Sequence, residues 1–167
     1  LDNASDKLGF SFKKLLFEEN EDLAKTQFSQ PAILLVSSIA NKILLDNMEL
    51  DVGFVMGHSL GEISANVSSG AINYLDGVEL VHKRGLLMSE ACSSKDAGMM
   101  VVLGMSDELV EEICIELVDN KKDIFLANYN VDGQIVLAGS KKDLEEAIPI
   151  FKDKGAKRAM LLAMNVA

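Results

Sequence analysis

The sequence predicts an α/β protein, with a core built on a parallel sheet and a smaller α+β subdomain of antiparallel strands. Three observations predict this class. A serine flanked by glycines follows a short apolar run and opens a helical pattern at residues 57–62. From about residue 96 the pattern becomes strand, helix, strand, strand, helix, strand. A hydrophobic content of 49% is enough to fill a core in 167 residues. The expected boundaries are residues 1–95 and 162–167 for the core and 96–161 for the subdomain.

The core is expected to be arranged around the stretch GHSLGE at residues 57–62. Residues 50–56 form an apolar run of strand length, and apolar side chains recur at helical spacing after the motif. A serine between two glycines at a strand-to-helix turn is typical of the nucleophile elbow of α/β-hydrolase-like cores. We therefore expect Ser59 to act as a nucleophile and the Leu60 backbone N–H to donate to an oxyanion. The alternative is that Ser59 is only the N-cap of a buried helix.

Composition and charge limit the compartment and the partners. The net charge of −10 argues against nucleic acid or an anionic membrane as the main partner. Cys92 and Cys114 have neither disulfide-framework nor metal-ligand spacing, which favours a reducing cytoplasm. The longest apolar stretch, residues 31–45, is interrupted by serine, asparagine and lysine, so no membrane span is expected. No signal peptide is visible, and the start at Leu1 rather than methionine suggests that residues precede it.

Before the elbow, the sequence predicts helices rather than strands. Residues 1–20 are expected to form a loop and then a short helix at about residues 11–18. Residues 26–47 are predicted to form a long helix with Pro31 in its first turn. Apolar residues cover most of the circumference of this helix, so we expect it to be buried.

The helix predicted at residues 75–93 carries an arginine on its apolar face. Glu79 and Lys83 share the polar side at i, i+4 spacing, whereas Arg84 lies among glycine, leucine and methionine. An arginine in that position is costly unless an anion meets it. The alternatives are an arginine whose head reaches solvent, or one that pairs with a structural carboxylate.

Residues 96–161 carry the signals of a split βαββαβ subdomain of the ferredoxin-like type. An Asp-Gly turn is expected to join the second and third strands as a hairpin. Ser106 and Ser140 are expected to cap the two helices. Pro149 should kink or weaken the second of these helices, and Gly155 should end it. Strands are expected at residues 97–103, 124–128, 134–139 and 157–166.

A serine nucleophile needs a general base, which is usually a histidine. The chain has two. His58 adjoins Ser59, and adjacent side chains on a sharp turn diverge, so we expect His58 to pack or hydrogen-bond near the pocket. His82 is expected on the polar side of its helix, at the surface and pointing away from Arg84. Either the protein is not a serine enzyme, or the base lies outside these 167 residues.

Four short motifs follow one another along the chain: QPA at residues 30–32, GHSLGE at 57–62, HKRGLLM at 82–88 and ANYNVDGQIV at 127–136. Their content and order resemble the malonyl-CoA:acyl carrier protein transacylase family, the acyltransferases of fatty-acid and polyketide synthesis. The resemblance spans nearly the whole chain, including the position of the small subdomain. It implies transfer of a malonyl group from malonyl-CoA to acyl carrier protein through a malonyl-serine intermediate. It implies no metal or redox cofactor.

The resemblance also implies roles for individual residues. Ser59 would be the acylated serine, and the Leu60 N–H one of the oxyanion donors. Arg84 would bind the free carboxylate of the malonyl group as a bidentate ion pair, and would thereby disfavour an acetyl group. His58 and Asn128 are expected to contribute to the substrate pocket. We expect a cytoplasmic monomer of fatty-acid biosynthesis whose partners are malonyl-CoA and acyl carrier protein.

The chain departs from the family pattern at both ends. The family loop that supplies the second oxyanion donor would precede Leu1. The catalytic histidine of the family would follow the last strand, beyond Ala167. We therefore expect the central portion of a longer protein, inactive by itself. Two alternatives stay open: a GxSxG serine hydrolase, and a non-catalytic fragment that binds CoA or carrier protein.

Overall fold

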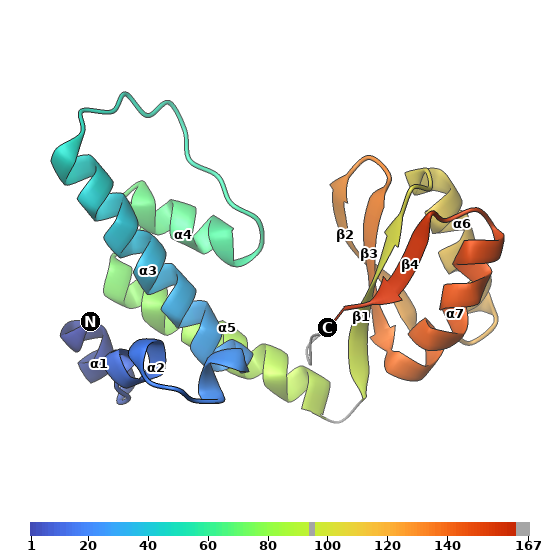
Figure 1. The fold of residues 1–167 in the computed structure, drawn as a ribbon, viewed down its shortest axis with the longest axis horizontal. Helices are drawn as coiled ribbons and strands as arrows, with labels where there is room; N and C mark the ends of the chain where they lie inside the picture. Colours follow the sequence, from blue (N-terminus) through green and yellow to red (C-terminus); the bar gives the residue numbers. More distant parts are fainter. Residues whose placement is uncertain (94–95, 163–167) are drawn as a thin grey trace. The chain divides into compact units, whose positions relative to one another are not determined.

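The computed structural model describes residues 1–93 and 96–162, and the chain divides into two compact units, Leu1–Ser89 and Glu90–Ala167. The described part of the first unit is helical, and the second unit contains a four-stranded sheet (Figure 1). Helix α5 (Tyr74–Ser93) begins in the first unit and ends in the second.

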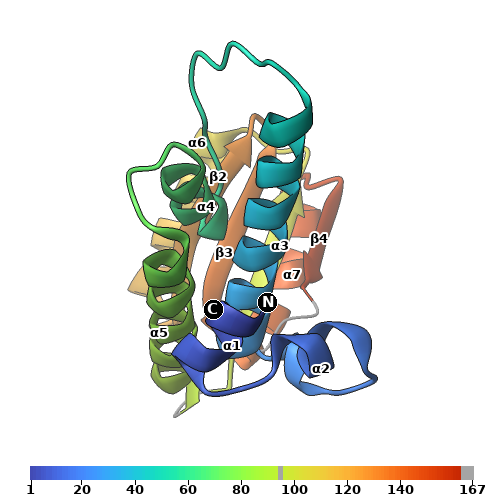
Figure 2. The same ribbon diagram turned by 90° about the vertical axis from the view of Figure 1, so that its left-hand side faces the viewer.

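The first unit packs its helices around one apolar cluster. Besides α5 it contains α1 (Asp2–Leu8), α2 (Phe12–Phe17), the 3-10 helix η1 (Asp22–Ala24), α3 (Thr26–Asn47) and α4 (Leu60–Ser68). Figure 2 shows the segment between α3 and α4 extending beyond both helices. The buried cluster consists of Ala4, Phe12, Leu15, Ala32, Leu34, Leu35, Val78 and Val81.

Helix α1 replaces a predicted loop. Asp2 in its first turn and Lys7 in its last turn complement the helix dipole. Gly9 ends the helix in the left-handed conformation, with φ 75°. The signals span only seven residues, and a helix that short depends on tertiary packing rather than on propensity. The next helix, α2, confirms the short helix predicted at residues 11–18, and the Ser11 hydroxyl caps it.

The strand predicted at residues 50–56 is wrong. These residues have no regular secondary structure and are exposed, the Phe54 side chain by 77%. A strand is stabilised by backbone hydrogen bonds to a neighbouring strand. Residues 1–89 contain no strand with which this segment could pair. The parallel sheet predicted for the core is therefore absent from the described residues, 1–93 and 96–162, whose strand pairs are all antiparallel.

Helix α3 has the predicted length but not the predicted burial. Its buried side chains lie between Gln30 and Leu35, whereas Ile33 is 54% exposed and Ile43 is 59% exposed. The apolar residues occupy more of its circumference than its neighbours cover. By length and composition, α3 is the one helix in the described part of the chain that could cross a membrane. Core helices meet the same criterion, and the buried side of α3 packs into the apolar cluster of the first unit.

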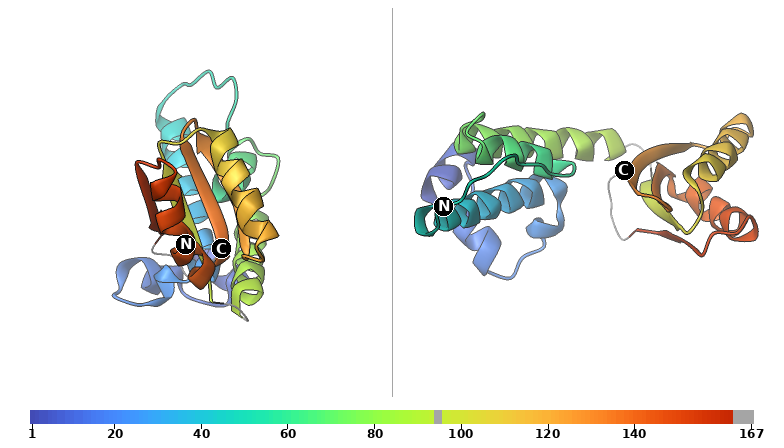
Figure 3. Two further views of the ribbon diagram at one scale, coloured as in Figure 1. Left: turned by 90° about the vertical axis from the view of Figure 1, so that its right-hand side faces the viewer. Right: turned by 90° about the horizontal axis from the view of Figure 1, so that it is seen from above.

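The second unit confirms the predicted βαββαβ order. Its elements are β1 (Ala97–Leu103), α6 (Asp107–Asp119), β2 (Ile124–Val131), β3 (Gln134–Ser140), α7 (Lys141–Asp153) and β4 (Arg158–Leu161). The sheet order is β2-β3-β1-β4, and every neighbouring pair is antiparallel. Helices α6 and α7 lie on the same face of the sheet (Figure 3, right). Residues 163–166 of the last predicted strand lie outside the described residues.

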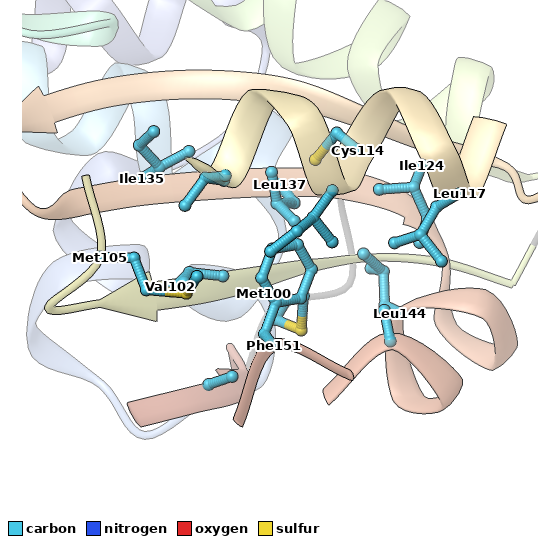
Figure 4. Close-up of a cluster of buried hydrophobic side chains, with 14 residues drawn as sticks. Met100, Val102, Met105, Cys114, Leu117, Ile124, Ile135, Leu137, Leu144 and Phe151 are labelled. Atoms are coloured by element: carbon cyan, nitrogen blue, oxygen red, sulfur yellow. The ribbon is translucent and has the colours of Figure 1, made fainter. Parts of the chain in front are cut away.

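Alternating strand residues form the core of the second unit beneath its two helices. Met100 on β1 lies opposite Leu137 on β3, and both are fully buried. Leu144 and Phe151 of α7 pack on the same cluster (Figure 4). The predicted serine caps are present: Ser106 accepts from Leu109 N–H, and Ser140 from Asp143 N–H. Helix α7 continues through Pro149, and Gly155 follows its C-cap with φ 106°.

Asp143 links the start of α7 to the residues that lead into β2. Its carboxylate accepts the Asp123 N–H at 3.0 Å, the Ser140 hydroxyl at 2.9 Å and the Lys122 ammonium at 3.1 Å. These donors, the Asp123 N–H first, lower the pKa of Asp143 from 3.8 to about 2. Because the folded-state pKa is depressed, the stabilisation is complete above the unfolded-state pKa and is lost as the pH falls from about 4 to about 2.

We expect Asp143→Asn to destabilise the protein at neutral pH and to weaken the pH dependence of its stability between pH 2 and 4. Glu145→Gln is the matched control, because it removes one carboxylate from the same helix at an exposed position. Urea unfolding at several pH values measures both effects. Equal pH profiles for the two variants would contradict the role of Asp143.

Candidate active site

The turn before α4 has the strained serine of a nucleophile elbow, although no strand precedes it in the described residues. Ser59 adopts φ 53° and ψ −108°, a conformation that is strained for a residue with a side chain. A Cβ atom on Gly57 would lie 2.2 Å from the backbone C and O of Gly61. Only glycine at position 57 therefore allows the chain to return so closely on itself. A Cβ on Gly61 would meet nothing within 4 Å, so the close approach depends on the glycine at position 57 alone.

Gly57 and Gly61 offer a matched pair of substitutions. Gly57→Ala should force the turn open and displace Ser59, at a stability cost of about 1–3 kcal/mol. Misplacing a nucleophile by an ångström lowers the rate of its reaction by roughly 10²-fold. Gly61→Ala, with open space around its new Cβ, should leave the turn intact. The rate at which a serine-directed acylating reagent modifies Ser59, measured for both variants, tests this difference. Equal losses for the two would contradict the close contact at position 57.

The Ser59 hydroxyl is not used as a helix cap. Ser59 occupies the N-cap position of α4, but its side chain makes no capping hydrogen bond. Its Oγ instead accepts a hydrogen bond of 2.7 Å from Nη2 of Arg84. Since Oγ acts as the acceptor, its own proton remains available to a general base. The structure thus favours a functional serine over the N-cap alternative.

The first N–H of α4 can act as an oxyanion donor. The first four N–H groups of a helix have no partner within the helix. Gly61 N–H donates to the His58 carbonyl and Glu62 N–H to that of Ser59. No acceptor for the Leu60 N–H occurs among the described residues. It lies next to the nucleophile at the positive end of a helix, as the sequence predicts.

Gln30 is a member of the site that the sequence analysis did not identify as one. Its side chain, 6% exposed, accepts a hydrogen bond of 2.5 Å at Oε1 from Arg84 Nη1. Its Nε2 donates to Thr26 Oγ1 at 2.6 Å and to Met88 Sδ at 3.4 Å. These two acceptors fix the orientation of the amide, so that its oxygen faces Arg84. The available signal was a glutamine on the buried side of an apolar helix, where a polar side chain needs partners.

The guanidinium of Arg84 therefore donates hydrogen bonds to two neutral acceptors, the amide oxygen of Gln30 and the hydroxyl of Ser59. Its partners come from α3 and from the elbow, 54 and 25 residues away in the chain. No carboxylate among residues 1–93 and 96–162 forms an ion pair with it, in contrast to its neighbour Lys83, which pairs with Glu79 at 2.9 Å. The predicted alternative of a structural carboxylate partner is not supported. A cation with neutral partners beside a nucleophile can bind an anionic substrate group.

The two histidines have different surroundings. His58 is exposed and lines a groove of about 1070 Å³ between α3 and α4, to which Leu60 also contributes but Ser59 and Arg84 do not. His82 was predicted at the surface, and this is wrong. Its Nδ1 lies 2.7 Å from the carbonyl oxygen of Gln27, and its ring lies beside two phenylalanines. Neither histidine is hydrogen-bonded to Ser59 in the described structure.

Asn128 lies in the second unit, on β2, opposite Val136 at a register shift of the hairpin. Its side chain is half-buried. Its contribution to the substrate pocket stays a prediction. In the described part of the chain, no three histidine, cysteine or acidic side chains come together as a candidate metal site.

A strained serine at a helix start, a free N–H beside it and an arginine within hydrogen-bond distance make a candidate nucleophile site that would suit acyl groups with an anionic end. The acyl transferase domain model matches residues 1–167, and the chain belongs to this family.

Curated relatives and solved structures agree with the family assignment. The chain is 40% identical over 166 residues to the malonyl CoA-acyl carrier protein transacylase of Staphylococcus aureus strain MRSA252. It is 38% identical over 165 residues to that of Bacillus subtilis strain 168. These alignments cover 99% and 98% of the chain but only 53% and 52% of the relatives, so the chain spans about half their length.

The fold is similar to solved structures of the same class. A malonyl-CoA:acyl carrier protein transacylase from Helicobacter pylori matches 99% of this chain and 53% of its own with a TM-score of 0.89 and 45% identity. A malonyl-transacylase in complex with a type II polyketide synthase acyl carrier protein matches 99% of this chain and 53% of its own, with a TM-score of 0.91 and 36% identity.

Proposed function

We propose that the protein containing this chain transfers a malonyl group from malonyl-CoA to the phosphopantetheine thiol of acyl carrier protein. The observation that carries the proposal is the 2.7 Å hydrogen bond from Arg84 to the hydroxyl of the strained Ser59. It puts a cation next to the atom that would carry the acyl group. A malonyl group has the one feature that such a cation would select, a free carboxylate. The names of the relatives provide independent support.

In the first half-reaction, Ser59 Oγ attacks the thioester carbonyl of malonyl-CoA. The Oγ–C bond forms, the C–S bond breaks, and the serine proton passes through a general base to the leaving CoA thiolate. The Leu60 N–H donates to the oxyanion of the tetrahedral intermediate. In the second half-reaction the thiol of acyl carrier protein attacks the malonyl ester by the same route and releases Ser59. Two such steps amount to ping-pong transfer.

Arg84 would provide the substrate selectivity. Its two terminal nitrogens donate to Gln30 and Ser59. A malonyl carboxylate offers a planar pair of anionic oxygens, which match the donors of a guanidinium better than neutral acceptors do. An acetyl group offers none, and therefore gains nothing from the same arginine.

The base is proposed to be a histidine contributed by sequence outside residues 1–167, as in the family that the chain resembles. We further propose that the first unit belongs to an α/β-hydrolase-like core, with residues 1–95 and 162–167 on one side of the domain boundary. The exposed apolar residues of α3 support this, because a layer packed on that helix would bury them. We also propose that the protein is a cytoplasmic monomer and uses no metal or redox cofactor.

Product analysis of the full-length protein tests the function. With malonyl-CoA and the phosphopantetheine form of acyl carrier protein, we expect malonyl-acyl carrier protein as the main product. Intact-mass analysis after malonyl-CoA alone should show one malonyl adduct, which peptide mapping places on Ser59. Free malonate as the main product would indicate a serine hydrolase instead. Bound CoA without any adduct would indicate a non-catalytic binding protein.

A further inference from the structure

Pro31 leaves one backbone carbonyl of α3 without its usual partner. In an α-helix the N–H of residue i donates to the carbonyl of residue i−4. Pro31 lies inside α3 and has no N–H, so the carbonyl of Gln27 receives no hydrogen bond from position 31. A carbonyl left in this way inside a packed unit needs another donor.

His82 of α5 supplies that donor. Its Nδ1 lies 2.7 Å from the Gln27 carbonyl oxygen, across 55 residues of sequence. A carbonyl oxygen can only accept, so Nδ1 must carry a proton; the ring is either the neutral Nδ1–H tautomer or the imidazolium. The ring packs beside two aromatic neighbours that also contact each other, with centroid distances of 5.6 Å to Phe10 and 6.2 Å to Phe28.

Gly85, three residues further along α5, touches the same turn of α3. A Cβ at position 85 would lie 2.6 Å from Gln27 Cα and 2.7 Å from the carbonyl oxygen of Thr26. The two helices therefore meet backbone to backbone at this turn. His82 and Gly85 flank Arg84 in sequence, and the turn that they contact is followed directly by Gln30, the partner of Arg84.

We infer that His82 is a positioning residue. By donating to the carbonyl that Pro31 leaves free, it fixes α5 against the first turns of α3, so that Arg84 reaches Gln30 and Ser59 together. The consequence for substrate choice rests on the proposed malonyl selectivity of Arg84; the hydrogen bond itself does not. A histidine that merely filled space beside the two phenylalanines would be replaceable by any ring of similar size.

Two substitutions separate the hydrogen bond from the ring. His82→Phe keeps an aromatic ring but has no donor, and leaves the Gln27 carbonyl unsatisfied. We expect the folding equilibrium constant of the full-length protein to fall by about tenfold, the low end of the effect of an unsatisfied group, because this carbonyl is part-buried. The preference for malonyl-CoA over acetyl-CoA should fall as well. His82→Asn, whose side-chain N–H can replace Nδ1–H, should keep the preference to within about threefold of wild type.

Combining His82→Phe with Pro31→Ala tests the inference most directly. Alanine restores an N–H at position 31, which can donate to Gln27 within α3, so His82→Phe should then have little further effect on selectivity or on the free energy of unfolding. An undiminished effect of His82→Phe in the Pro31→Ala background would overturn the inference. An Asn variant as impaired as the Phe variant would also overturn it.

Nitrogen NMR of His82 gives a readout that needs no activity. At a pH where the ring is neutral, we expect the proton on Nδ1 and not on Nε2. A neutral ring protonated only on Nε2 would overturn the inference. If the full-length protein forms no malonyl-serine at all, the proposed function fails, while the tautomer and the double-mutant stability cycle still decide the role of His82.

Discussion

Replacing Ser59 by alanine should abolish malonyl transfer. The covalent route requires an oxygen at this position, and knockouts of serine nucleophiles lower turnover on the order of 10⁵-fold or more. Alanine meets the same backbone strain at φ 53° as serine does, so the turn itself should persist. Intact-mass analysis after exposure to malonyl-CoA should show no adduct, and transfer to acyl carrier protein should fall to background.

Ser69→Ala is the matched control for Ser59→Ala. The Ser69 hydroxyl donates to the Asn66 carbonyl at the far end of α4, so its loss removes an exposed hydroxyl outside the turn. This variant should form the adduct at the wild-type rate. A malonyl adduct on Ser59→Ala that maps to another side chain would contradict the assignment of the nucleophile.

Replacing Arg84 by alanine should lower the preference for malonyl-CoA over acetyl-CoA and leave the nucleophile in place. Losing hydrogen bonds to a charged group costs about 1.5–3 kcal/mol, which corresponds to roughly 10- to 150-fold in kcat/KM for malonyl-CoA. Acetyl-CoA makes no use of the guanidinium, so its kcat/KM should stay the same or rise. The ratio of the two values, measured under single-turnover conditions, reports the effect on selectivity.

Two further variants show whether the effect of Arg84→Ala is specific to this side chain and to its pair of donors. Lys83→Ala removes a cation from the neighbouring position of α5, where it pairs with Glu79 on the outer side, and should leave the preference unchanged. Arg84→Lys keeps the charge but loses the planar pair of donors, and should recover only part of the malonyl preference. An unchanged preference in Arg84→Ala would refute the proposed binding of the malonyl carboxylate.

Local signals in the sequence were sufficient to predict most of the second unit and the strained turn at Ser59. Ser106 and Ser140 cap helices where the sequence placed them, and the strand order of the small sheet follows from the βαββαβ pattern. The glycine-flanked Ser59 adopts the strained turn that its motif predicts. These features are decided within a few residues, by capping groups, by side-chain periodicity and by the conformational freedom of glycine.

Other parts of the chain were not predictable in this way. An apolar run such as residues 50–56 becomes a strand only beside another strand, and the described residues of the first unit provide none. The apolar circumference of α3 was correctly identified, but whether it is buried depends on what packs against it. Helical periodicity placed His82 on the polar side of its helix, whereas its ring lies against α3 and two phenylalanines.

By itself, the sequence predicted which residues would carry the chemistry: a serine in a glycine turn and an arginine on an apolar helix face. Only the tertiary structure decided that Gln30 completes the pair and that His82 satisfies the carbonyl left free by Pro31. The physical reason is the distance along the chain between the interacting groups. Turns and caps are determined by neighbouring residues, whereas a hydrogen bond between α3 and α5 joins groups more than 50 residues apart, whose meeting depends on how the two helices pack.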